Sequence, residues 1–253
     1  MTVKEIAELI EEKAPLSLAA EYDNSGMVVE THNDEVNKIV VALDMTAEVI
    51  EKAVSENANL IVTHHPIIFS PIKKLKLDVS VTSLVMKAVK NNIAVYSAHT
   101  NFDNCSGGIA DAIMDALGAY DCEELEEDGC GRVGNVENRK LSDIVRSLTE
   151  FTGSSSLRVS GEKDRRIRRI AVINGAGGRD ESIIDVLRKK DVGLFVTGEM
   201  KHSLALELKA NGIAFIDVEH YCAERVFVRL MSAVLKKSGA EIIEFEETNP
   251  YEE

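Results

Sequence analysis

Short runs of apolar residues recur along the chain, separated by longer stretches in which apolar positions return every three or four residues. The short runs, rich in Val and Ile, are typical of strands buried on both faces, and the longer stretches predict helices. The predicted strands are 27–29, 38–43, 60–63, 92–97, 157–160, 170–173, 194–197, 213–218 and 242–245. Helices are predicted after Thr2, after Thr46, over 80–91, up to Leu117, over 141–151 and 181–190, up to Ala210 and around 226–230. Because strands and helices alternate, we expect an α/β fold.

The order of strands and helices in the first half of the chain repeats in the second half. The strand segments of the first copy are 38–41, 59–63 and 93–95, and those of the second are 169–172, 193–197 and 213–215. In this register His64-His65 falls on Gly198-Glu199, and His99 falls on Glu219 beside His220. Since α/β sheets collect their chemistry at the carboxyl ends of strands, we infer two α/β domains related by an internal repeat, with one site in the cleft between them.

The acidic run 123–128, followed by glycines at 129, 131 and 134, is the clearest change of composition in the chain. Such a change is typical of a domain boundary. We therefore predict a first α/β domain formed by 1–122 together with 219–253, and a second formed by 123–218.

Composition and charge restrict the class of protein. The 253 residues carry a formal net charge of -14, which disfavours nucleic acid and anionic membranes as partners, because both require a basic face. The four cysteines lack a Cys-x-x-Cys spacing, as is typical of reduced thiols. The sequence shows neither a secretory leader pattern nor an apolar run long enough to cross a bilayer. We expect a soluble cytoplasmic protein.

The strand at 60–63 is followed abruptly by His64, His65 and Pro66. Neighbouring residues of a strand point to opposite faces, so both imidazoles serve one site only if the chain turns between them, which the proline favours. Similar polar residues follow other strands. The nitrogen and oxygen donors among them are His64, His65, Asp103, His220 and Glu224.

These five donors exceed what a single catalytic metal usually takes from protein, and they suit two divalent ions that share a bridging carboxylate. His220 and Glu224 are four residues apart, on one face of a helix. Such donors accept Fe, Zn, Mn, Co or Ni, and the residues do not choose among them. Taken singly, a His-x-x-x-Glu pair is usually a surface contact and Asp103 is often a helix cap. The interpretation as a metal site depends on the whole set.

His99, Glu199 and His202 also follow predicted strands. His99 or Glu199 would take a proton from a metal-bound water, whose pKa falls to about 7 on a zinc-type centre, or both would orient the ligands. Both interpretations stay open. The glycines at 175, 177 and 178 follow a strand and precede a helix, which favours close packing over phosphate binding. Cys222 is interpreted as a small buried residue.

These residues stand in blocks that resemble the Nif-three-like family, the type 2 homologues of GTP cyclohydrolase I. The matching blocks are Tyr22-Asp23-Asn24-Ser25-Gly26, Ala42-Leu43-Asp44-Met45-Thr46, Thr63-His64-His65-Pro66, Ala98-His99-Thr100-Asn101-Phe102-Asp103, Gly107-Gly108, Gly198-Glu199-Met200-Lys201-His202, and His220-Tyr221 with Glu224. The resemblance implies a two-domain α/β protomer, a toroidal homohexamer and a dinuclear metal centre held by the five donors. It also implies that His202, Asp23 and Asn24 hold the ligands or contact substrate. Glu219 departs from the pattern, since a glycine is common there, and the inserted domain of longer members is absent.

Two functions follow as hypotheses. The first is a hydrolase in which two divalent ions activate water against a nucleotide or another phosphorylated small molecule, with purine-ring opening of GTP as the reaction that the family name implies. The second is a ring-shaped metal-binding protein that regulates or binds a partner, such as a nucleic-acid end, without turnover.

Overall fold

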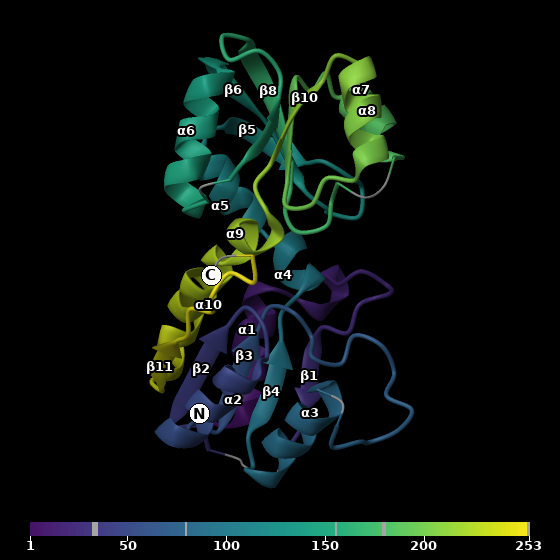
Figure 1. Ribbon diagram of the computed structural model, residues 1–253. Helices are drawn as coiled ribbons and strands as arrows, with labels where there is room; N and C mark the ends of the chain where they lie inside the picture. Colours follow the sequence, from purple (N-terminus) through teal and green to yellow (C-terminus); the bar gives the residue numbers. More distant parts are fainter. Residues whose placement is uncertain (32–34, 79, 155, 179–180, 252–253) are drawn as a thin grey trace. The chain divides into compact units, whose positions relative to one another are not determined.

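The chain folds around parallel strands whose carboxyl ends carry the predicted site residues. The computed structural model describes residues 1–31, 35–78, 80–154, 156–178 and 181–251. These divide into two compact units: Met1–Cys105 with Phe227–Glu253, and Ser106–Val226. Each unit contains its own sheet, as Figure 1 shows.

The sheet of the first unit orders its strands β1-β4-β3-β2-β11. Their bounds are β1 Gly26–Val29, β2 Lys38–Ala42, β3 Leu60–Thr63, β4 Ala94–Ser97 and β11 Glu241–Glu244. β11, β2, β3 and β4 pair in parallel, and β1 joins β4 antiparallel. Because β2, β3 and β4 are fully or nearly fully buried and rich in Val and Ile, they form the centre of this sheet.

Helices cover this sheet and connect its strands. They are α1 Val3–Lys13, α2 Ala47–Glu56, α3 Ser80–Lys90, the short α4 Thr100–Asn104, α10 Val226–Leu235, and the 3-10 turns Leu16–Leu18 and Lys236–Ser238. The predicted capping box of α1 is confirmed, since Thr2 and Glu5 exchange side-chain to backbone hydrogen bonds. Apolar residues of α2 and α3 pack with alternate residues of β2, β3 and β4 in one core cluster.

The sheet of the second unit orders its strands β5-β6-β8-β9-β10-β7. The bounds are β5 Tyr120–Glu124, β6 Arg132–Lys140, β7 Arg158–Ser160, β8 Arg166–Ile173, β9 Leu194–Thr197 and β10 Ala214–Asp217. β8, β9 and β10 are parallel, whereas β5, β6 and β7 join antiparallel. Parallel β8, β9 and β10 correspond to three of the predicted strands.

Helices lie along both faces of the second sheet. They are α5 Ile109–Ala116, α6 Leu141–Thr152, α7 Ile183–Lys189 and α8 His202–Ala210, and the one-turn α9 His220–Glu224 follows β10. Figure 1 shows α5 and α6 on one side of the sheet and α7 and α8 on the other. Apolar residues of α7 and α8 form a core cluster with alternate residues of the strands, among them Val133, Ala171 and Phe195.

The compact units and the predicted domains differ in their bounds. The units divide after Cys105 and after Val226, whereas the predicted domains divide after 122 and 218. The acidic segment that suggested a boundary instead contains the end of β5 and the turn between β5 and β6, which pair inside the second sheet. As a result His220 and Glu224, assigned from the sequence to the first domain, lie in the second unit.

The fold is mixed α/β with two sheets among the described residues, as the sequence predicted. Each unit contains a run of consecutive parallel strands, β2-β3-β4 and β8-β9-β10. The relation of the two runs as an internal repeat stays a prediction. No helix in the described ranges combines the length and the apolar character needed to cross a bilayer.

Candidate metal centre

The first group of donor side chains lies at the carboxyl end of β3. His64 and His65 directly follow Thr63, and the backbone N–H groups of both donate to the carbonyl of Leu43, at 3.1 and 3.0 Å. The hydroxyl of Thr63 donates to the carbonyl of His65 at 2.9 Å. These bonds end the strand and turn the chain at the histidines, as the sequence predicted.

His64, His65 and His99 each use Nδ1 to contact an oxygen. His64 Nδ1 lies 2.8 Å from the carbonyl oxygen of Ala98, and a carbonyl only accepts, so this nitrogen carries the proton. His65 Nδ1 lies 2.9 Å from an oxygen of Asp44, and His99 Nδ1 lies 2.7 Å from an oxygen of Asp23. The same pattern fixes imidazoles that bind metals through Nε2.

The donor atoms of this group lie close together. One ligand atom from each of His64, His65 and His99 falls within 4.8 Å of the others. Asp103, on α4, places Oδ1 3.6 Å from Nε2 of His64. Three of the five predicted ligands, His64, His65 and Asp103, therefore belong to one cluster in the first unit, and His99 belongs with them.

Asp23 is a buried carboxylate that fixes His99. Burial alone would raise its pKa, but hydrogen bonds from His99, Ser25 and Thr100 outweigh burial and hold the pKa of Asp23 well below its ordinary value. The adjacent Asn24 donates from Nδ2 to the carbonyl of Ile68 at 2.6 Å. The predicted role of Asp23 and Asn24 in holding other residues in place fits these contacts.

A second group of donors lies in the second unit, on α9. His220 Nε2 and Glu224 Oε2 are 2.8 Å apart, so the predicted i, i+4 pair is formed. His220 Nδ1 contacts Glu199 Oε1 at 2.6 Å, and Asn174 Nδ2 donates to Glu224 Oε1 at 2.9 Å. Since Glu224 is only 2% exposed, its carboxylate requires partners such as these.

Gly175 makes room for this pair. The residue has φ of +55°, and a Cβ built on it would lie 2.3 Å from Glu224 Oε1 and 3.3 Å from His220 Nε2. A Cβ on Gly177 would lie 2.2 Å from Ile173 Cγ2, and one on Gly178 would lie 2.1 Å from the carbonyl oxygen of Glu199. The glycine turn thus serves close packing, the interpretation that the sequence favoured over phosphate binding.

Glu219 adopts a backbone conformation that suits glycine. Its φ is +66° and its ψ is 139°, which an L side chain tolerates only with strain. Its backbone N–H donates to Asp217 at 3.0 Å, and its carboxylate accepts from Ser156 at 2.5 Å. These contacts hold the turn that delivers His220 to the site.

We expect glycine to be more stable than alanine at position 219. Ala is ordinarily better than Gly by roughly 0.5–1 kcal/mol within helices and strands, whereas a strained backbone costs about 1–3 kcal/mol in a residue with a Cβ. Glu219→Gly should therefore exceed Glu219→Ala in free energy of unfolding by up to about 2.5 kcal/mol. Both variants lose the same side-chain contacts, so chemical denaturation compares them directly. An Ala variant that is more stable than the Gly variant by about 0.5–1 kcal/mol would show that the turn carries no strain.

Two further residues that the sequence analysis discussed are His202 and Cys222. His202 begins α8 and is exposed, beside a hollow of about 270 Å³ that Arg158 and Phe215 also line. Cys222 is 4% exposed, and its thiol contacts Glu219 Oε2 at 3.4 Å, in agreement with a small buried residue.

Three residues that the sequence did not assign to the site support it. Asp44 accepts from His65, Asn174 donates to Glu224, and Glu247 accepts from the backbone N–H groups of Leu43 and Asp44 at 2.7 and 2.8 Å. Burial raises the pKa of Glu247 above its ordinary value despite these bonds. Asp44 and Asn174 follow strands shortly after their carboxyl ends, which is the signal that could have identified them.

The fold and these groups define an α/β protein with candidate metal-binding sites made of imidazoles and carboxylates. A family model described as Duf34/NIF3 (NGG1p interacting factor 3) matches residues 1–250, and the chain belongs to this family. The resemblance identified in the sequence is thereby confirmed.

Similar proteins match this chain over most of their own length and of its length. A protein of Clostridium acetobutylicum named GTP cyclohydrolase 1 type 2 homolog is 36% identical over 244 residues, which cover 93% of this chain and 90% of the relative. A solved structure titled reduced HcgD from Methanocaldococcus jannaschii is 30% identical, covers 98% of both chains and has a TM-score of 0.86. A Bacillus cereus protein related to NIF3, 21% identical with a TM-score of 0.88, covers 100% of this chain and 99% of its own, and shows the same fold.

Proposed function

We propose that the chain is a divalent-metal-dependent hydrolase with a dinuclear centre. The ligands in this proposal are His64, His65, Asp103, His220 and Glu224. The observation that carries it is the arrangement of the imidazoles: His64, His65 and His220 each direct Nδ1 at a carbonyl or carboxylate oxygen. This leaves the Nε2 lone pairs of His64 and His65 for a cation, the arrangement found in metal-binding histidines, and Nε2 of His220 faces Glu224, the ligand proposed beside it.

The donor set fits hard and borderline divalent ions. Imidazole nitrogens and carboxylate oxygens suit Fe, Zn, Mn, Co and Ni, and the proposed set contains no thiolate that would favour softer ions. Bound divalent ions supply water activated for nucleophilic attack at neutral pH and polarise a carbonyl or phosphoryl oxygen. The name of two relatives, GTP cyclohydrolase 1 type 2 homolog, supports a nucleotide or another phosphorylated small molecule as the substrate class.

Two further residues of the chain have separate roles, one in proton transfer and one in orienting a ligand. We assign proton transfer to His99, because Asp23 accepts from its Nδ1 at 2.7 Å and stabilises the imidazolium that forms when Nε2 takes a proton. Glu199 instead orients His220, since its oxygen lies 2.6 Å from Nδ1 of that residue. Glu199 thereby fixes the tautomer of a proposed ligand.

Turnover by the metal-loaded chain tests the proposal. The chain, purified and reconstituted separately with Fe, Zn, Mn, Co and Ni, would be assayed against a panel of nucleoside mono-, di- and triphosphates by chromatography of the products. We expect hydrolysis with at least one ion, and its loss in His65→Ala. Metal-dependent capture of a partner with no turnover would favour the regulatory alternative.

The homohexamer belongs to the same proposal, and light scattering of the metal-loaded protein would measure it.

A further inference from the structure

Two aromatic side chains of the first unit stand in solvent beside His99. Tyr22 is 72% exposed and Phe69 is 51% exposed. Their ring centroids are 6.4 Å apart, and the Phe69 ring meets the His99 ring edge-on, 6.2 Å away at 82°. Exposed aromatic surface is costly in water, and two exposed rings next to a candidate site offer a surface on which a ligand can bind.

Both aromatic residues are tied to the candidate site through the backbone. Tyr22 immediately precedes Asp23, the carboxylate that fixes His99. Phe69 immediately follows Ile68, whose carbonyl accepts from Asn24 at 2.6 Å. One hydrogen bond therefore joins the turn that carries Tyr22 to the segment that carries Phe69.

We propose that Tyr22 and Phe69 bind a planar heteroaromatic ring, such as a purine, and hold it beside His99. This inference rests on the proposed function and names the part of the substrate that the site recognises. The occupant is a flat ring because tilted aromatic side chains offer π-faces and edges, which every heteroaromatic ring can stack against. The chain's charge of -14 gives phosphate alone little general attraction, so the ring provides the recognition.

The segment after Phe69 suits a ring that carries a phosphate. Residues 67–78 connect β3 to α3 without helix or strand, and long connections of this kind are often binding loops. Lys73, Lys74 and Lys76 are exposed on it. In a strongly acidic chain, these lysines give the loop a local positive charge that complements a phosphate attached to the ring.

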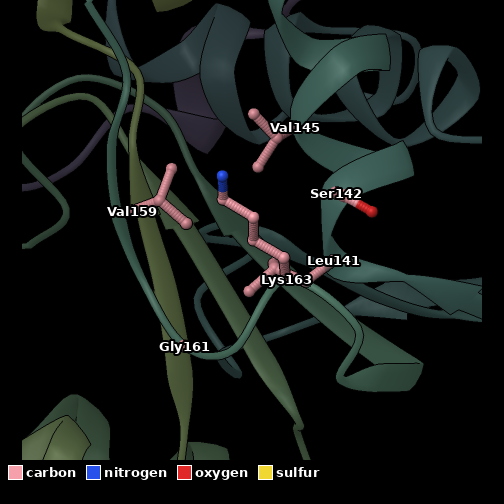
Figure 2. A pocket seen from close by; sticks show the side chains of 6 residues that line it. All are labelled: Leu141, Ser142, Val145, Val159, Gly161 and Lys163. Atoms are coloured by element: carbon pink, nitrogen blue, oxygen red, sulfur yellow. The ribbon is translucent and has the colours of Figure 1, made fainter.

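A different hollow provides the competing location. In the second unit, a cavity of about 240 Å³ is lined by Leu141, Ser142, Val145, Val159, Gly161 and Lys163. Figure 2 shows the side chains of Val145, Val159 and Lys163 converging on it. An apolar wall with one amine would also accept a phosphorylated ring, so the experiment must separate the two locations.

Ligand-observed NMR titrations with guanosine 5′-monophosphate and with ribose 5-phosphate distinguish binding at Tyr22 and Phe69 from binding in this cavity. We expect Tyr22→Ala and Phe69→Ala to weaken guanosine 5′-monophosphate binding by about 5- to 150-fold, the equivalent of about 1–3 kcal/mol of stacking. Tyr22→Phe and Phe69→Tyr, which keep the rings, should bind within about two-fold of the unsubstituted chain. Ribose 5-phosphate should bind equally to all of them, and Val159→Ser should leave both ligands unchanged.

Three results would overturn the inference: guanosine 5′-monophosphate affinity unchanged in both Ala variants, ribose 5-phosphate weakened as much as the nucleotide, or loss of nucleotide binding in Val159→Ser alone. Circular dichroism of each variant confirms that it is folded. Metal content and turnover are measured on the same samples. Failure of the proposed function would appear as absent metal or absent turnover in the unsubstituted chain, whereas failure of the ring site would leave both intact.

Discussion

Glu224→Gln is expected to lower the affinity of the chain for divalent metal by more than about 100-fold, and to abolish turnover with it. The replacement keeps the shape of the side chain and an oxygen that accepts from Asn174, but it removes the negative charge next to Nε2 of His220. Losing a residue that only orients a metal ligand typically costs 10- to 100-fold in affinity or activity, and the loss of a ligand should cost more. Competition with a chromogenic chelator measures the affinity.

Glu207→Gln is the matched control for this variant. Glu207 is an exposed glutamate on α8, and its replacement by Gln changes the net charge by the same amount as Glu224→Gln. It should leave metal affinity and turnover unchanged. If Glu224→Gln binds metal as tightly as this control, Glu224 is not a ligand.

Phe227→Ala is expected to destabilise the first unit by about 3–5 kcal/mol, a large share of the roughly 5–15 kcal/mol that holds a typical folded chain together. Phe227 is fully buried, and its ring centroid lies 4.9 Å from that of His64 and 5.1 Å from that of Phe102. The cavity would remove the support behind the His64 ring. We therefore also expect weaker metal binding. Urea unfolding followed by circular dichroism measures the stability.

The conservative replacement Phe227→Leu fills most of the space and should cost less than about 1.5 kcal/mol. It should also retain metal binding. Equal stability of the Ala and Leu variants would contradict the inference that this ring packs as a core residue against the imidazole.

The sequence predicted the central parallel strands and the helices between them because their signals are local. Leu60 to Thr63 and Leu194 to Thr197 are continuous apolar runs, and both are fully buried strands in the structure. The first helix carries its start signal in Thr2 and Glu5. Where the pattern of residues and the tertiary structure agree, the elements fall within a few residues of their predicted bounds.

β5 and β6 escaped prediction because tertiary pairing, and not residue preference, forms them. All five residues of Tyr120–Glu124 are exposed, so this edge strand lacks the alternation of a half-buried strand. β6 contains a register shift between Asn135 and Arg139, which interrupts its periodicity. An acidic, glycine-rich segment therefore resembled a linker while it formed the edge of a sheet.

The candidate site, too, could be predicted only in part. The positions of the candidate donors could be predicted, because His64, His65 and His220 follow apolar strands that the local sequence shows, whereas their role as metal ligands stays a prediction. Asp44 and Asn174 could have been identified as candidates, because each follows a strand, but the donor that each of them contacts could not. Asp44 lies 21 positions before His65, and Asn174 lies 50 positions before Glu224, so only the folded backbone brings each pair together.

The most direct test of the account is the metal content of the chain, measured by inductively coupled plasma mass spectrometry after purification without chelator and reconstitution with a single divalent ion. The account predicts two ions per chain, and fewer in both His65→Ala and Glu224→Gln, while Glu207→Gln matches the unsubstituted chain. A folded chain that retains no ion, or variants that retain as much metal as the unsubstituted chain, would contradict it.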